Sequence, residues 1–502
     1  MVLVASAASS MLKNKSQEQV ELDQCIPGSP GMFKFLGHNI VKLQENQTAT
    51  FQNFCFKSNQ ASFFFTSALE IEVNIYSTHP KDLLCSDTFF VTSITNMQIH
   101  TKFVRGASTH FMKLSSQEDA DYIRANGLTI IPACDKLINF LPDIFETALL
   151  FTDYIGAKKL PPKVETYLQL KIYKKLEELG GQSSFERNPD AAAIDLNWLY
   201  SNVRSGDVYC LFTPSSTDML VLYGTGGNCE HTGMFLWDSS KVLWMVESNT
   251  PVVHKFTAQS WIHKLKAPTT YTMNLLRLRP DLSASFNADA AWSAFNQYNG
   301  FPYGYENFLF SFLDTPEDNV TPFMNTDLIL TMVAIADKLP IPTVQANITQ
   351  YVLEAMNHRL GTQNLDMNGL LEQMAIQKLS IGQVMAIPEN PNWTYGVGTP
   401  FEGKRFICSA LTTYLLKAGG ALGDVTVVPQ EFTPNDVFNL NIWEQASQRP
   451  ALCVSNDSKL PYCQLSGMRS LVPFRFNAFT PYNHMNESCP ALAPSYERPT
   501  GC

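Results

Sequence analysis

The sequence is short of charge and has no long hydrophobic run. Only 16% of its 502 residues are charged, against about a quarter in typical globular proteins, and the formal net charge is −10. No cluster of lysines and arginines is dense enough to neutralise a run of phosphates, which argues against a nucleic-acid-binding protein. No stretch approaches the roughly 18 apolar residues of a membrane helix, so we expect no transmembrane span.

The sequence also lacks any CxxC pair with zinc-finger spacing, although it has eleven cysteines. A structural zinc site is therefore not expected. Four of the cysteines fall in the last fifty residues, within Pro- and Asn-rich sequence of the kind that disulfides stabilise. We expect a disulfide-bonded protein of the secretory route, either secreted or lysosomal. An odd number of cysteines leaves at least one thiol unpaired if the bridges are intramolecular.

Two further features of the sequence are relevant to a secretory route but are weak evidence for it. Seven N-x-S/T sequons fit a glycoprotein, yet their number is not far above chance: Asn14, Asn46, Asn319, Asn347, Asn392, Asn456 and Asn486. Residues 1–15 combine a short apolar run with an Ala-Ser-Ala of signal-peptidase type but have no basic start. A signal-peptide remnant and a disordered start both stay open.

The N-terminal part of the chain is β-rich. Residues 69–76 and 97–103 alternate apolar and polar side chains, the pattern of half-buried strands. Ser116 begins a capping sequence for a short helix that ends at Asn126-Gly127. A longer helix is predicted at 162–179, between two prolines and two glycines. We therefore assign residues 1–185 to a β-rich N-terminal domain with C-terminal helices.

A second domain is predicted over residues 190–445, followed by a cysteine-containing tail at 446–502. It begins with a helix at 191–203 and continues with short apolar strands at 208–212, 219–223, 232–237 and 242–247. Residues 310–395 interrupt this domain as a largely helical insertion. The predicted fold class is α+β.

Cys408 opens the stretch FICSALTTYLLKAGG, an amphipathic helix that stops at two glycines. A helix N-terminus favours negative charge, so it can activate a thiol as thiolate. A small buried residue at a helix start is the plainer interpretation of such a cysteine. The choice depends on whether a histidine partner exists.

His231 is the strongest candidate partner, because it stands at the mouth of an apolar strand. A turn sequence at 238–241 predicts a hairpin that returns Glu247 to the His231 end. If the register pairs residue 231 with 247, both side chains share a face and the carboxylate can orient the imidazole. A one-residue slip passes that role to Ser248. His254, seven residues after Glu247, is a rival base, and His263 follows nine residues later.

The order of these motifs resembles that of a known family. Gly206-Asp207-Val208, His231-Thr-Gly-Met-Phe-Leu, Val246-Glu247-Ser248 and Phe406-Ile-Cys408-Ser-Ala-Leu look like the motifs of circularly permuted NlpC/P60 (YiiX-like) papain-like thiol hydrolases. Asn299-Gly-Phe-Pro-Tyr303-Gly-Tyr305 resembles the tyrosine-containing segment ahead of the family's cysteine. The match covers roughly residues 190–425, and the histidine precedes the cysteine as in the permuted branch.

The resemblance implies a papain-like core, in which an antiparallel sheet packs on the cysteine helix, and a thiol hydrolase activity. Cys408 would be the nucleophile, His231 the base and Glu247 the residue that orients it, with Tyr303 or Tyr305 beside the oxyanion. Gly206 and Asp207 would shape a structural turn. The implied substrate is a peptide, amide or acyl-lipid, and neither a metal nor an organic cofactor is called for.

The competing hypothesis is a non-catalytic secreted protein on the same scaffold. In that case the N-terminal region binds a glycan or a protein, and Cys408 pairs with another cysteine. A disulfide at Cys408, or a thiol far from any imidazole, would favour this alternative.

Overall fold

The computed structural model describes most of residues 41–132, 187–304 and 344–478, together with Asn307. Short gaps occur inside these ranges, and the longest is 214–228, where only Asp218 and Val221 are described. Several predicted features lie outside the described residues: the chain start at 1–15, the helix at 162–179, Tyr305, most of the strand at 219–223 and the end of the tail.

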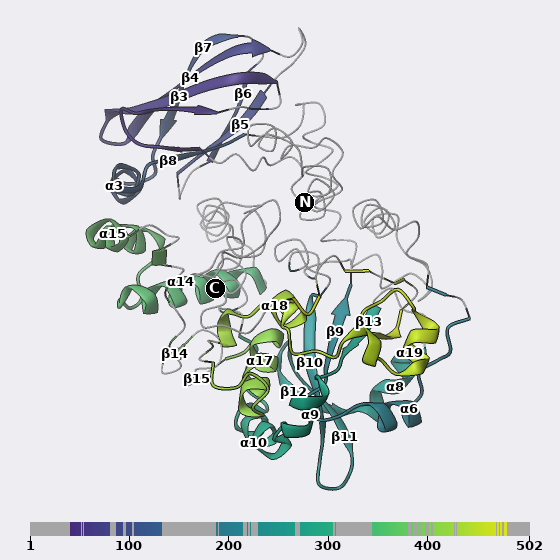
Figure 1. Ribbon diagram of the computed structural model, residues 1–502. Helices are drawn as coiled ribbons and strands as arrows, with labels where there is room; N and C mark the ends of the chain where they lie inside the picture. Colours follow the sequence, from purple (N-terminus) through teal and green to yellow (C-terminus); the bar gives the residue numbers. More distant parts are fainter. Residues whose placement is uncertain are drawn as a thin grey trace. The chain divides into compact units, whose positions relative to one another are not determined.

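The described residues group into two compact units, and both mix helices with antiparallel sheets, as the predicted α+β class requires (Figure 1). One unit contains residues 41–132 and 344–402, and the other contains 187–307 and 405–478. No helix within the described ranges is long and apolar enough to cross a membrane.

The first unit is built on two four-stranded antiparallel sheets. One has the order β1-β8-β5-β6 and the other the order β2-β3-β4-β7. The strands are β1 (Val41–Leu43), β2 (Thr48–Phe51), β3 (Phe56–Ser67), β4 (Glu70–Pro80), β5 (Asp87–Thr92), β6 (Met97–Lys102), β7 (Gly106–Lys113) and β8 (Leu128–Pro132). Both sheets contribute to one core, as Phe63 and Val91 illustrate. The strands predicted at 69–76 and 97–103 are confirmed as β4 and β6.

Three helices within the described residues belong to the same unit: α3 (Gln117–Asn126), α14 (Val344–Leu360) and α15 (Met367–Gln377). The side chain of Ser116 accepts a hydrogen bond from the Asp119 N–H, and Gly127 ends α3 at φ 83°, so the predicted helix and both of its ends are confirmed. Helices α14 and α15 lie within the predicted insertion at 310–395, and α15 lies against α3. A small hairpin, β14 (Thr394–Tyr395) and β15 (Phe401–Glu402), completes the described part of this unit.

The second unit has a six-stranded antiparallel sheet of order β12-β11-β10-β9-β13-β16. Its strands are β9 (Val208–Phe212), β10 (His231–Trp237), β11 (Leu243–Asn249), β12 (Val252–Thr257), β13 (Thr272–Leu276) and β16 (Cys463–Ser466). The helices of its described part are α6 (Leu196–Asn202), α8 (Ala258–Lys266), α9 (Pro280–Ser285), α10 (Ala288–Tyr298), α17 (Cys408–Ala418), α18 (Pro434–Asn439) and α19 (Ala451–Asn456), with short 3₁₀ turns η2 (Pro429–Glu431) and η3 (Ala446–Gln448).

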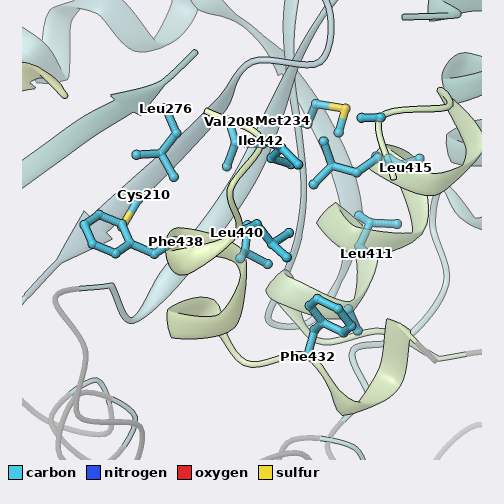
Figure 2. Packing of buried hydrophobic residues seen from close by; sticks show 14 of the residues in the cluster. Val208, Cys210, Met234, Leu276, Leu411, Leu415, Phe432, Phe438, Leu440 and Ile442 are labelled. Carbon is cyan, nitrogen blue, oxygen red and sulfur yellow. The ribbon is translucent and has the colours of Figure 1, made fainter. Parts of the chain in front are cut away.

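Apolar side chains cover both faces of this sheet, because successive strand residues point to opposite sides. Val208 and Met234 share one core with Leu411 and Leu415 of α17, and Figure 2 shows these side chains meeting. Tyr209 belongs to the opposite core, which includes residues of α6 and α8. The sheet is therefore held between α10, α17 and α18 on one face and α6 and α8 on the other.

The local predictions for this unit are largely confirmed. The predicted strands at 208–212, 232–237 and 242–247 are β9, β10 and β11, within two residues at each end. The predicted helix at 191–203 is wrong in its first turn, since α6 begins at Leu196. Asp195 caps that helix, and the Ala192 N–H donates to Asn456 Oδ1, a tertiary contact that holds the preceding backbone extended.

The β10–β11 hairpin has a register that the sequence left open. Met234 pairs with Val246, so one step further Gly233 lies opposite Glu247, and residue 231 is not level with 247. The offset from the register considered above is two residues. Because side chains alternate with a period of two, His231 and Glu247 still share a face.

Candidate active site

Cys408 is the first residue of α17, and its side chain is buried, with 5% of the residue exposed. Five other cysteines fall in the described part of the chain, and all are disulfide-bonded. Cys210 pairs with Cys229, Cys453 pairs with Cys463, and Cys55 is also in a disulfide. Cys408 is the free cysteine among the described residues. Disulfides of this number fit a protein that folds in an oxidising compartment.

The thiol lies beside the first residues of β10. The ladder between β10 and β11 ends at the pair Met234–Val246, so the edge of β10 beyond it is open on that side. Cys408 Sγ lies 4.0 Å from the Glu230 carbonyl oxygen, and it accepts a hydrogen bond from the Thr232 N–H. The separation of two strands thus makes room for the N-terminus of α17.

His231 and Cys408 lie close enough for their charges to shift each other's pKa. Burial raises the pKa of the Cys408 thiol, but the positive charge of His231, its side-chain hydrogen bond and the N–H groups of Thr232 and Ser409 bring that pKa below its usual value. Burial lowers the pKa of His231, yet the Cys408 thiolate and the Glu247 carboxylate raise it well above the usual range. Both shifts favour a thiolate beside an imidazolium.

Glu247 holds the opposite side of the imidazole. His231 Nε2 lies 2.8 Å from Glu247 Oε2. The other carboxylate oxygen, Oε1, lies 2.8 Å from His254 Nε2, and the Tyr209 hydroxyl donates to Oε2. Burial raises the pKa of Glu247, but the positive charge of His231 and these three hydrogen bonds bring it well below the usual range. The carboxylate therefore stays ionised although it is buried.

The rival base, His254, pairs directly with Glu247 across β11 and β12. Its side chain is 38% exposed and binds the same carboxylate through a different oxygen. The electrostatic partner of Cys408 is His231 rather than His254. The side chain of His263 lies outside the described residues.

Ser248, the residue that a one-residue slip would have put in place of Glu247, faces the other way. Its hydroxyl donates to the Phe406 carbonyl oxygen at 2.6 Å, two residues before Cys408. In the observed register, Glu247 therefore contacts His231, and Ser248 contacts the segment that leads into α17.

Tyr303 lies beside the same segment. It forms a parallel bridge with Phe406, and the N–H of the next residue, Gly304, donates to the Phe406 carbonyl oxygen at 3.0 Å. A Cβ at Gly304 would lie 3.0 Å from the backbone of Arg405 and Phe406, so a side chain there would require this backbone to shift by a few tenths of an ångström. These contacts bring the backbone of Tyr303 close to Cys408 in space. Tyr305 lies outside the described residues.

Gly206 and Asp207 form the turn into β9. Gly206 has φ +92°, a conformation that favours glycine. The Asp207 carboxylate accepts hydrogen bonds from the N–H groups of Arg204 and Leu278, at 2.9 Å each. Burial raises the pKa of Asp207 to about 7, against the opposing effect of these two bonds. Asp207 thus ties the start of β9 to the end of β13, away from the thiol.

The sequence interpretation missed four residues near the Cys–His pair: Tyr209, Gly233, Glu230 and Asp218. Tyr209 was assigned to a strand without a role. Gly233, a glycine inside the next strand, is a sign of close approach that could have indicated a large neighbour. Glu230 and Asp218 are acidic groups close enough to His231 to interact with its charge, and burial raises the pKa of both, with that of Asp218 at about 6. No pattern in the sequence marks them.

Among the described residues no group of three histidines, cysteines or acids is arranged to hold a metal ion. Comparison with known protein families, curated proteins and solved structures finds no match to this chain.

Proposed function

We propose that this protein is a cysteine hydrolase that cleaves an amide or ester bond through a thioester acyl-enzyme. The observation that carries the proposal is the buried free thiol of Cys408, paired with His231, whose other ring nitrogen binds Glu247. Nucleophilic catalysis at an acyl group requires a nucleophile, a base beside it and a carboxylate that orients the base, and these three residues supply those groups in that order. That Cys408 is free while the other described cysteines are bridged supports the same role.

In the first half-reaction the Cys408 thiolate attacks the substrate carbonyl carbon, and the carbonyl π electrons move to oxygen. Collapse of this intermediate breaks the bond to the leaving amine or alcohol, which takes its proton from His231. In the second half-reaction His231 accepts a proton from water as the water oxygen attacks the thioester. The acid is released, and the Cys408–His231 pair is restored.

The N-terminus of α17 supplies the electrostatic stabilisation. The first N–H groups of a helix have no intrahelical partner, so the Cys408 N–H can donate to the oxyanion. We assign the Tyr303 hydroxyl a supporting role there, because its backbone neighbours the segment before Cys408. Glu247 remains ionised throughout and stabilises the imidazolium.

The proposal includes the permuted NlpC/P60 type of fold. Three features support it: the histidine and carboxylate strands precede the cysteine helix, the strands are antiparallel, and α17 packs against β10 and β11. The disulfides support a secreted or lysosomal location. The substrate class is an amide, peptide or acyl ester. The aromatic side chains of Tyr298, Phe301 and Phe406 pack on one another and against the apolar core of this unit.

Alkylation by iodoacetamide at pH 6, read by peptide mass spectrometry, tests the activated thiol. We expect fast labelling at Cys408 that His231→Ala slows strongly, with Cys408→Ala as the site control. Hydrolysis of p-nitrophenyl acetate, with transient acetylation of Cys408, tests the acyl transfer itself. Slow labelling of Cys408 in the folded protein, at the rate of an ordinary thiol, would refute the hydrolase and favour a binding protein on this scaffold.

A further inference from the structure

Four residues form a row across the sheet around the Glu247 carboxylate. Tyr209 of β9 pairs with Gly233 of β10, and Glu247 of β11 pairs with His254 of β12. The β10–β11 ladder ends at the pair Met234–Val246, and its register continued by one step puts Gly233 opposite Glu247. All four positions therefore lie on one face of the sheet, the face that His231 shares. The row crosses four strands.

Gly233 is what allows Tyr209 to reach the carboxylate. A Cβ built at Gly233 would lie 2.3 Å from the Tyr209 hydroxyl oxygen and 2.4 Å from Cζ. The phenol ring thus crosses β10 directly over the glycine, and its hydroxyl arrives at Glu247 Oε2, the same oxygen that binds His231. Any side chain at position 233 would occupy this path.

The environment of Tyr209 fixes its hydroxyl. Only 1% of the residue is exposed, and its ring packs against Phe235, 5.5 Å between centroids, and Trp261, 6.5 Å. Burial, and then the negative charge of Glu247, raise the pKa of Tyr209 well above its usual value, so the hydroxyl keeps its proton and remains a donor. A donor held this rigidly can set the orientation of the carboxylate that it binds.

We propose that Tyr209 is a positioning residue of the active site. Its ring passes over Gly233, and its hydroxyl holds Glu247 Oε2 toward His231. The inference rests on the proposed function, because it concerns how the orienting carboxylate is itself oriented. His254 binds the other oxygen from the half-exposed side. Without the Tyr209 hydroxyl, the carboxylate turns toward His254 and solvent, and the thiolate–imidazolium pair loses part of its stabilisation.

The test compares the pH dependence of Cys408 alkylation by iodoacetamide in the wild-type protein, Tyr209→Phe and Glu247→Gln. Tyr209→Phe keeps the ring in place and removes only the hydroxyl. We expect it to lower the alkylation rate at pH 6 by about three- to tenfold and to move the midpoint upward, since loss of a charge-assisted hydrogen bond leaves Glu247 with fewer donors. At pH 10 the rates should converge, because the thiol then ionises without help.

Tyr462→Phe is the matched control. Tyr462 is a buried tyrosine of the same unit that packs against Phe438 and Phe476, and its loss of a hydroxyl should leave the profile of Cys408 unchanged. Gly233→Ala displaces the Tyr209 ring by a second route and should lower the rate at pH 6 further. If that variant does not fold, the comparison of Tyr209→Phe with Tyr462→Phe still tests whether the Tyr209 hydroxyl positions Glu247.

Three outcomes separate the two claims. A wild-type Cys408 that ionises like an ordinary thiol refutes the proposed function and this inference together. A low-pH thiolate that Glu247→Gln abolishes and Tyr209→Phe leaves intact refutes only the role of Tyr209. A shift with Tyr209→Phe in a protein of unchanged melting temperature supports positioning, because a purely structural role would not change the pH profile alone.

Discussion

Phe286 lies between the turn that leads into β9 and the end of α17, and the glycines that face it give a graded test of this packing. A Cβ at Gly206 would come within 2.7 Å of Leu278 Cδ1 and 2.9 Å of the Phe286 ring, and a Cβ at Gly419 within 2.1 Å of that ring. Gly206 also has φ +92°, whereas Gly419 has φ −75°. Gly300 has φ +88° and open space around its Cβ position.

These differences assign a magnitude to each substitution. Gly300→Ala adds left-handed backbone strain, about 1–2 kcal/mol. Gly419→Ala adds overpacking against Phe286, about 1–3 kcal/mol. Gly206→Ala adds both and should destabilise the unit by about 2–5 kcal/mol. For a unit of this size, that lowers the melting temperature by roughly 4–20 °C, against roughly 2–8 °C for Gly300→Ala.

Tryptophan fluorescence during thermal unfolding is the assay, because all of the seven tryptophans except Trp393 belong to this unit. The comparison that decides is Gly206→Ala against Gly300→Ala, since the two share the strain and differ in the contacts. Equal melting temperatures for these two variants would show that Phe286 and Leu278 do not pack against the Gly206 turn.

Four further predictions concern the second unit. The Glu247 carboxylate lies 2.8 Å from His231, and its charge stabilises the imidazolium by about 1.5 kcal/mol if screened as in water and about 6 kcal/mol at an effective dielectric of 20. Glu247→Gln should therefore slow alkylation of Cys408 at pH 6 at least about tenfold. An unchanged rate would contradict the role of Glu247 as the residue that orients His231. Because the pKa of Glu247 is lower in the folded protein, its stabilisation is present above the ordinary glutamate pKa and lost as pH falls, so the same variant should flatten the acid side of the melting-temperature profile. His254→Gln keeps an N–H donor at an exposed position and should change the rate by less than about threefold, whereas a larger loss would make His254 part of the base. Replacing Cys210 and Cys229 by alanine should cost about 3 kcal/mol in unfolding experiments, as expected for a closed loop of about 20 residues, and a stability equal to that of the wild type would show that the bridge does not form.

Much of the local structure could be predicted. The apolar alternation at 69–76, the Ser116 cap and the glycines after Lys417 each act within a few residues of where they stand, so β4, α3 and α17 begin or end close to their predicted positions. The failure at 191–195 has the opposite cause. There the extended backbone is held by Asn456, far along the chain, which no local pattern reports.

The candidate site shows the same division. The sequence by itself determined that Cys408 opens a helix, that His231 opens a strand, and that Glu247 lies on the neighbouring strand of a hairpin, because periodicity and turn residues encode these features locally. Only the tertiary structure decided the two-residue offset of the register, the free state of Cys408 and the approach of Tyr209 over Gly233. These depend on contacts between distant segments: Cys408 and Glu230 are neighbours at 178 residues of separation. Such contacts form only when the sheet and helix pack together, since packing, and not local propensity, selects which strand edge meets the helix N-terminus.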